Sequence, residues 1–269
     1  SIGTDLTLPG GNWDINSLIT LADGSYNILA AATDKAGNIN VSGCLLLTVD
    51  TVTPAPQDLA LAAGSDSGVS ASDRITRGIS SSVPAFNGTV TITGTAELQS
   101  TVTLSNSTGV LGQAIMGDDA SNGILNDRLG RWTFTSILPE GVNNITATAV
   151  DLAANTSNVS QPLVVTIDTR IAKPAITGIS PDNGPSSTDR KTNNGRITIS
   201  GTADPGDMVT LSEGASVLGS PVIANSSGVW TFDNTANLLS DGIHVFTATS
   251  SDLAGNGNNA AATSNPVSV

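Results

Sequence analysis

The chain has 269 residues, with 23 acidic and only 10 basic side chains, and its formal net charge is −13 at pH 7. Such a surface repels phosphate backbones and anionic lipid headgroups, so nucleic acid is excluded as a partner, and no apolar run is long enough to predict membrane insertion. At roughly 100 to 150 residues a domain, this length predicts two to three domains. β-branched residues lie between Gly, Asn and Asp turn formers, which predicts an all-β protein.

One sequence pattern occurs three times along the chain, at 11–51, 130–169 and 228–269. It contains ATDKAGN, then AVDLAAN, then SSDLAGN, and its first two copies end in TVDT and TIDT. A second block, containing TVTITGTA and then RITISGTA, precedes only the last two copies. We therefore predict the C-terminal part of one domain at 1–53 and full domains at 54–170 and 171–269, called units one, two and three.

Within a unit, segments such as TVTITGTA, RWTFTSI and NITATAV have the alternating apolar pattern of short strands separated by turn residues. About seven such strands per unit predict tandem immunoglobulin-like β-sandwiches; their arrangement as an elongated rod is implied by the family resemblance described next. Cys44 is the only cysteine, so no intrachain disulfide of the antibody type can form. Trp13, Trp132 and Trp230 share one position in the repeat, and we predict that each anchors a core.

The phrases ATDKAGN, AVDLAAN and SSDLAGN, followed in the first two units by TVDT or TIDT and a Pro-containing linker, resemble the bacterial Ig-like repeats of giant type I-secreted adhesins. The resemblance covers the whole chain. It implies an extracellular rod at the bacterial cell surface, with calcium bound at acidic sites near the domain junctions. It also implies a virulence role, in which the parent adhesin attaches to a glycan or receptor of a host cell.

Acidic residues fall where the strand order of an immunoglobulin sandwich places the two poles of each unit. The loop after the sixth strand faces the preceding unit, and the loop between the first two strands faces the following one. At the junction of units two and three we expect Asp66, Asp73, Asp168 and Asp252, with Asp204 or Asp207. At the junction of units one and two we expect Asp50, Asp151 and Glu97, while Asp182 and Asp189 face a following domain and Asp34 faces upstream.

Carboxylates that converge across a junction repel one another unless a cation lies between them. Calcium accepts six to eight oxygen ligands in loose geometry, and these loops offer neither the His nor the Cys that zinc prefers. The resemblance and the repetition therefore predict Ca²⁺ as the bound ion. The alternative for each Asp is an Asx turn or a loop cap without any metal.

An insertion in unit two, MGDDASNGILNDRLGR, offers a further acidic loop. Its pattern departs from an EF-hand because Ala120 and Leu129 occupy ligand positions, so a solvated hairpin extension is favoured there. The residues in it that resemble a calcium loop are Asp118, Asp119, Asn122, Gly123 and Asp127.

Catalytic groups do not recur among the repeats. His244 is the only histidine and has no second histidine with which to form a ligand cluster, so we predict a surface strand residue. The main prediction is a monomeric, non-enzymatic structural and adhesive segment whose partners are the neighbouring Ig-like domains of its own chain. Two alternatives stay open: direct binding of a host glycan or receptor through the insertion, and accessory domains of a secreted polysaccharide hydrolase.

Overall fold

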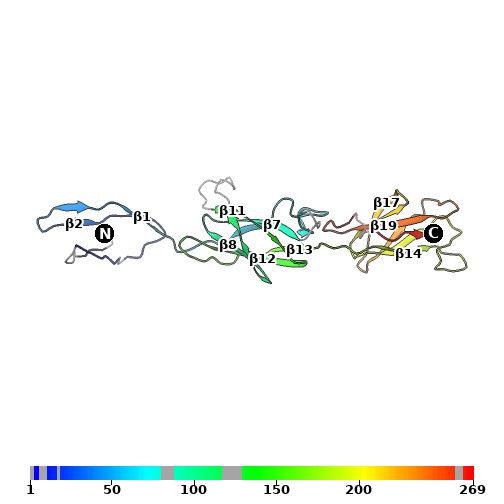
Figure 1. Cartoon of the computed structure of the whole chain (residues 1–269), viewed down its shortest axis with the longest axis horizontal. Helices are drawn as coiled ribbons and strands as arrows, with labels where there is room; N and C mark the ends of the chain where they lie inside the picture. The colour runs from blue at the N-terminus through cyan, green and yellow to red at the C-terminus, as the bar shows by residue number, and fades with distance from the viewer. Residues whose placement is uncertain (1–2, 6–10, 17–18, 80–87, 117–128, 258–262) are drawn as a thin grey trace.

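The protein is elongated, and the three units follow one another along its long axis in the computed structural model (Figure 1). The structure describes residues 3–5, 11–16, 19–79, 88–116, 129–257 and 263–269. All regular elements in these ranges are strands, as predicted. A helix long and apolar enough to cross a membrane is absent from these ranges.

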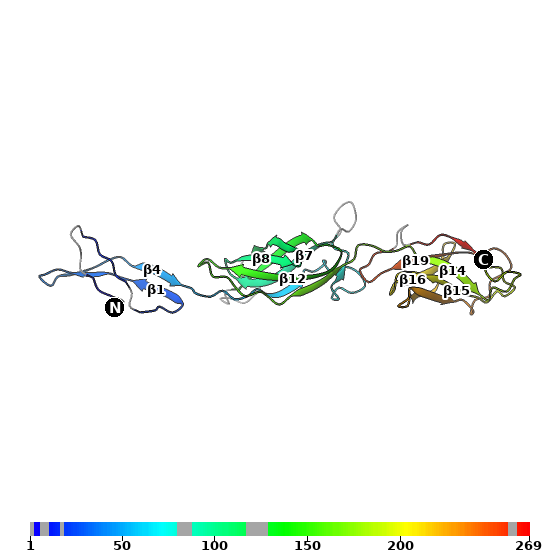
Figure 2. The same ribbon diagram turned by 90° about the horizontal axis from the view of Figure 1, so that it is seen from below.

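Unit two is a sandwich of two sheets, and its strands run along the long axis of the protein (Figure 2). Neighbouring strands are antiparallel, except that β13 pairs with β6 in parallel. One sheet has the order β10 (Ile115–Met116), β11 (Leu129–Ile137), β7 (Thr89–Glu97) and β5 (Gln57–Leu61). The other has the order β6 (Ile75–Thr76), β13 (Leu163–Ile167), β12 (Gly141–Val150), β8 (Thr101–Asn106) and β9 (Gly109–Gln113).

The core of unit two follows from the alternation of its strands. In β7, every second side chain from Val90 onward is buried, while the threonines between them are partly exposed. Trp132 on β11 is 0% exposed, and its indole packs against Gly94 of β7. The contact is so close that an added Cβ at Gly94 would lie 2.3 Å from Cζ2 of the indole. The prediction that Trp132 anchors a core is confirmed.

Unit three repeats this arrangement with a second core. Its sheets are β14 (Ala175–Ser180), β15 (Thr198–Thr202) and β18 (Val229–Asp233), and β17 (Ser216–Ile223), β16 (Met208–Glu213), β19 (Val245–Ser251) and β20 (Val267–Ser268). Trp230 on β18 is 1% exposed and packs against Gly201 in the same way, so the core prediction is confirmed there too.

Unit one pairs β1 (Gly24–Ile28) with β4 (Leu45–Val49), and β2 (Ala31–Thr33) with β3 (Ile39–Val41). No further sheet covers these strands in the described part of the unit. Leu45 is therefore 63% exposed, whereas Leu163, its counterpart in unit two, is 1% exposed. The prediction that Trp13 anchors a core is wrong, because its side chain is 52% exposed.

One position near the start of β1, β12 and β19 has a different residue in each unit but makes the same contact. The side chains of Tyr26, Asn143 and His244 each lie within hydrogen-bond distance of the backbone oxygen four residues earlier, at 2.7, 2.9 and 2.8 Å. These oxygens belong to the turn that precedes the strand. His244 itself lies one residue before β19 and is partly buried, so the prediction of an exposed strand residue is corrected.

Candidate functional site

The loop that follows β12 in unit two has the same hydrogen bonds as its counterparts, which follow β2 in unit one and β19 in unit three. Asp151 accepts the backbone N–H of Asn155 at 2.8 Å through Oδ1 and its side-chain N–H at 2.8 Å through Oδ2. Asp252 and Asp34 make the same pair of bonds to the asparagine four residues later. This is the Asx geometry that the sequence left open as an alternative to metal binding. It leaves each asparagine side chain with a second N–H to donate.

That second N–H contacts the linker from the preceding unit. Nδ2 of Asn155 donates to the backbone oxygen of Asp50 at 3.0 Å, and Nδ2 of Asn256 donates to that of Asp168 at 2.9 Å. The amide of Asn256 is also 3.2 Å from the oxygen of Arg170. The predicted position of this loop, at the pole that meets the incoming linker, is therefore confirmed.

The linker between units two and three is also held from other directions. The Glu140 carboxylate, in the loop that connects β11 in one sheet to β12 in the other, accepts the Thr169 hydroxyl at 2.9 Å and its backbone N–H at 3.1 Å. Oδ2 of Asp204 accepts the N–H of Ala172 at 3.0 Å, and the Ser250 hydroxyl lies 3.4 Å from the Ala172 oxygen. The linker is thus bonded to both units.

Negative charge accumulates at this junction. Burial raises the pKa of the Asp168 carboxyl, and the charges of Asp252, Glu140 and Asp204 raise it further. Burial also raises the pKa of Asp207 to about 6, with further repulsion from Asp204 and Asp252. Sequence reasoning predicted Asp66, Asp73, Asp168 and Asp252 here, with Asp204 or Asp207. The charges of Asp204 and Asp252 act on both Asp168 and Asp207, whereas the carboxylate that acts on Asp66 is that of Asp73.

Asp207 is the most unusual of these acidic residues. It is 2% exposed, and its Oδ2 atom has no hydrogen-bond partner among the described residues, although Ser250 forms a side-chain hydrogen bond to the carboxyl group. The corresponding residue in unit two is Ser100, which is also buried but whose hydroxyl donates to the oxygen of Glu97 at 2.6 Å. A buried carboxylate oxygen without a partner is costly for a protein to retain. It is therefore the atom of this junction that best fits a cation.

The first acidic loop of unit two makes its own network. Oδ2 of Asp66 accepts the N–H of Arg74 at 3.0 Å, and Oδ1 of Asp73 accepts that of Ile75 at 3.0 Å. Oδ1 of Asp66 is buried without a partner, and burial raises the pKa of this carboxyl. The repulsion between Asp66 and Asp73 adds to this increase, which places the two carboxylates near each other as predicted.

Unit three has the same loop at its opposite pole, away from unit two. Asp182 accepts the N–H of Arg190 at 3.0 Å, Asp189 accepts that of Lys191 at 3.2 Å, and Oδ1 of Asp182 is again buried without a partner. The two loops therefore have the same internal geometry in different surroundings.

The junction between units one and two has fewer acidic contacts. Burial alone would raise the pKa of Asp151, but hydrogen bonds from Asn155 and the neighbouring backbone leave it lowered. Oε2 of Glu97 is buried and unpartnered. Its counterpart Asp204 accepts the N–H of Ala172, whereas unit one's linker has Pro54 at that position, and proline has no N–H to donate. The Asp50 carboxylate accepts the N–H of Val52 at 3.4 Å, and its backbone oxygen is the atom that reaches unit two.

Among the described residues, no three His, Cys, Asp or Glu side chains lie close enough together, in their present conformations, to hold a metal ion. A cation at the junction of units two and three would need the carboxylates of Asp168, Asp204 and Asp252 to rotate toward Asp207, with backbone oxygens completing the ligand set. The donors are all oxygens, which fits calcium rather than zinc. The predicted insertion loop, including Asp118, Asp119 and Asp127, lies outside the described residues.

Sequence reasoning missed Glu140. Its counterpart in unit one, Asp23, accepts the Thr51 hydroxyl at 2.9 Å, as Glu140 accepts that of Thr169. The pattern was present in the repeat, because an acidic residue precedes glycine at the same place in ADGSY, PEGVN and SDGIH. Its pairing with the Thr of TVDT and TIDT identifies it as a cap on the outgoing linker.

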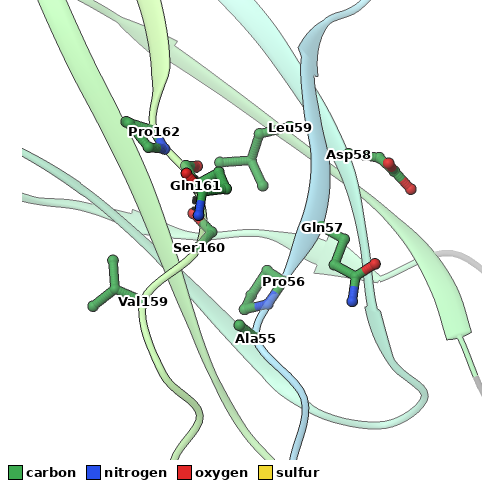
Figure 3. Close-up of a pocket in the computed structure, with 9 residues that line it drawn as sticks. All are labelled: Ala55, Pro56, Gln57, Asp58, Leu59, Val159, Ser160, Gln161 and Pro162. Atoms are coloured by element: carbon green, nitrogen blue, oxygen red, sulfur yellow. Dashed lines mark hydrogen bonds between the residues drawn. The ribbon is translucent and has the colours of Figure 1, made fainter.

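The surface of unit two also has a shallow pocket between β5 and the segment before β13 (Figure 3). None of its lining residues is aromatic, and Asp58 is the one charged residue among them. The Asp58 carboxylate points away from Gln161 and accepts the Thr95 hydroxyl at 3.3 Å. The pocket therefore presents no cluster of charged groups to a ligand. It is lined by Ala55, Pro56, Gln57, Asp58, Leu59, Val159, Ser160, Gln161 and Pro162.

A model of the bacterial Ig-like domain family matches the chain three times, at residues 3–51, 53–169 and 170–267. The chain belongs to the bacterial Ig-like domain family. Its three copies meet at the two linkers described above, so the acidic junctions lie between successive Ig-like domains. A comparison with curated proteins gives no match.

This chain is similar to several solved structures, and the descriptions of some of them name bacterial surface proteins. One concerns the host cell surface retention of a 1.5-MDa bacterial ice-binding adhesin, with 19% identity, 92% of this chain and 73% of that chain covered, and a TM-score of 0.34. Another is the BSP domain of a biofilm associated protein, with 17% identity and a TM-score of 0.27 over 72% of this chain and 28% of that one. A third contains fibronectin(III)-like modules of Clostridium thermocellum CbhA, with 16% identity and a TM-score of 0.33 over 79% and 92%. The assignment to the family rests on the family model.

Proposed function

We propose that this chain is a non-enzymatic rod section of a bacterial surface adhesin, in which calcium at the acidic junctions stiffens successive Ig-like domains. The parent protein would use the rod to present a binding region to a host-cell glycan or receptor. Asp207 is the observation that carries the calcium proposal, because its buried Oδ2 atom has no partner and other carboxylates surround it.

Electrostatics supports a cation at this position. At neutral pH the buried Asp207 carboxyl is largely ionised, although its pKa is raised to about 6 by burial and by the charges of Asp204 and Asp252. A divalent cation would turn this repulsion into attraction and provide the missing partner for Oδ2. Because Asp168 belongs to the linker and Asp252 to unit three, an ion shared by them would join two units.

The size of the effect follows from linkage. An ion that binds only the docked arrangement stabilises it by roughly 0.4 to 1.4 kcal/mol when its concentration is about 1 to 10 times Kd. Extracellular calcium modules have Kd values of about 0.1 to 1 mM, so such a site is substantially occupied at millimolar calcium. The junction would then resist bending wherever the protein is outside a cell.

Calcium titration of the metal-stripped chain by isothermal calorimetry tests the proposal. We expect saturable binding that is weakened at least about tenfold in Asp207→Asn, which keeps the side-chain shape but removes a charged ligand. Asp233→Asn is the matched control, because Asp233 is exposed at the opposite pole and its carboxylate accepts the N–H of Thr235. Equal binding by both variants, or no binding at millimolar calcium, would leave these acidic residues as turn and linker caps.

A further inference from the structure

A direct backbone contact joins units two and three beside the acidic junction. The N–H of Val69 donates to the oxygen of Leu253 at 3.1 Å, and the Ser67 hydroxyl lies 3.4 Å from the oxygen of Ala254. Ser67 is held in place by Thr76, whose hydroxyl is 2.9 Å away. Three residues of the first loop of unit two (67–69) therefore lie along three residues of the last loop of unit three (253–255).

Two glycines make this approach possible. Gly68 has a φ of +120°, and a Cβ on it would lie 2.1 Å from the oxygen of Leu253. Gly255 has a φ of +85°, and a Cβ on it would lie 2.8 Å from Cα of Gly68. Any side chain at either position would push the two loops apart, because the atoms that it would meet belong to the backbone.

Comparison of the units shows that the contact, and not the turn, requires glycine at 255. In unit two the corresponding residue is Ala154, which adopts a φ of +69° with its Cβ in place. Ala153 is exposed, whereas Ala254, the equivalent residue of unit three, is 0% exposed. The difference arises because loop 67–69 covers the last loop of unit three.

The corresponding loop at the far pole of unit three lacks part of this chemistry. Pro185 occupies the position of Val69 and has no N–H to donate. Asn183, at the position of Ser67, is bonded within its own loop to Thr192 and Asn193. The loop at the far pole of unit three therefore lacks the backbone donor that Val69 provides in unit two.

We infer that the contact between residues 67–69 and 253–255 is a docking surface that fixes unit three on unit two without requiring a metal ion. One backbone hydrogen bond, one hydroxyl bond and the contact of two glycines supply its geometry, whereas the proposed calcium site lies in the neighbouring carboxylates. The inference therefore stands independently of the calcium proposal.

Limited trypsin digestion of the full chain in EGTA provides the test, because Arg170 lies in the linker and its oxygen is bonded to Asn256. Loss of the docking contact exposes this peptide bond to the protease. We expect slow cleavage after Arg170 in the wild type and in Asp207→Asn. We expect cleavage roughly tenfold faster or more in Gly68→Ala, from the loss of the Val69 N–H bond and the Ser67 hydroxyl bond. Mass spectrometry of the fragments 1–170 and 171–269 gives the rate.

The matched control for Gly68→Ala is Gly64→Ala, since Gly64 has a φ of +82° and open space around it. Gly64→Ala strains a backbone with positive φ but removes no contact with unit three. Gly255→Ala tests the surface from unit three and has its control in Gly37→Ala, which has a φ of +90° and no atom within 4 Å of the added Cβ. Small-angle scattering in EGTA gives the extension of each folded variant.

Equal cleavage rates for Gly68→Ala and Gly64→Ala would overturn the inference. So would rapid cleavage of the wild-type chain after calcium removal, because an ion and not the backbone contact would then fix the junction. If Gly68→Ala lowers the unfolding temperature far more than Gly64→Ala, unit two itself is damaged. The cleavage rate of Gly255→Ala relative to Gly37→Ala then tests the docking surface, and equal rates would overturn the inference. Calcium binding in calorimetry together with equal rates would retain the proposed function and reject the docking surface.

Discussion

Nδ2 of Asn256 lies 2.9 Å from the backbone oxygen of Asp168 and 2.8 Å from Oδ2 of Asp252, so one amide joins a linker to the loop of the next unit. Asn155 makes the same connection to Asp50 at 3.0 Å. The Asx loop is therefore a structural part of the junction, whether or not its carboxylate also binds an ion. Its asparagine has both N–H groups engaged.

Replacement of Asn256 by alanine should loosen the linker. The change leaves the oxygens of Asp168 and Arg170 without their donor, and we expect a loss of about 2 kcal/mol in the stability of unit three. Asn38→Ala is the control, since Asn38 bonds to Asp34 but is not seen to bond a linker. Hydrogen exchange at 169–172 should increase in Asn256→Ala and stay unchanged in Asn38→Ala. A similar effect of both variants would show that only the turn was lost.

Calcium affinity should depend on Asp66 and not on Asp182. Both have a buried Oδ1 without a partner and the same bond to a following arginine, but only the Asp66 loop faces another unit of this chain. We expect Asp66→Asn to lower calcium affinity at least about threefold and Asp182→Asn to leave it unchanged, because the loop of Asp66 contacts the loop that begins with the proposed ligand Asp252. Equal losses would place the ion within the loop itself.

His244 should titrate above 6.5. Its two ring nitrogens lie 2.8 Å from the oxygen of Ser240 and 2.6 Å from Oε1 of Glu213, and hydrogen bonds to these acceptors raise its pKa. A raised pKa in the folded state stabilises unit three below pH 6.5, and this contribution is lost as the pH rises through the folded value. Because the chain has one histidine, its proton NMR signal reports the pKa directly.

Glu213→Gln should lower the pKa of His244, and His244→Asn should reduce the decline of the unfolding temperature between pH 6 and 8. The second variant has the residue that unit two uses at this position, Asn143. A wild-type pKa at or below 6.5 would contradict the geometry of doubly bonded imidazole.

Gly94→Ala should destabilise unit two by about 3 kcal/mol, because overpacking a core forces side chains from their preferred positions. The added Cβ would lie 2.3 Å from Cζ2 of Trp132 and 2.9 Å from the oxygen of Gln57. Gly43→Ala, with no atom within 4 Å, should change the stability of the chain by less than about 0.5 kcal/mol. Chemical denaturation followed by tryptophan fluorescence measures both. A small change in Gly94→Ala would mean that the indole can move aside.

The strand order of an immunoglobulin sandwich was sufficient to predict which loops meet at a junction. The position of Asp151 and Asp252 beside the linkers follows from chain order alone, because the sixth strand must end at the pole facing the preceding unit. Burial could not be predicted in this way. Asp207 and Ser100 occupy the same buried position, yet one is a carboxylate without a full set of partners and the other a bonded hydroxyl.

Trp13 shows a second limit of the repeat. Its alignment with Trp132 is correct, but burial requires a facing sheet, and the described part of unit one has none over this side chain. The asparagines of the Asx loops were overlooked for a different reason. An Asn in a loop is common in any sequence, and only the folded structure shows that its side chain reaches the linker from the preceding unit. The calcium ligands remain predictions.

The shared hydrogen bond of Tyr26, Asn143 and His244 bears on how such repeats diverge. A phenol, a carboxamide and an imidazole all reach the equivalent turn oxygen, so the three residues share reach and hydrogen bonding and not chemical identity. A comparison that scores identical letters would treat the position as unconstrained. Substitution by leucine or alanine should nevertheless be disfavoured in every repeat, because the turn would lose its tie to the strand.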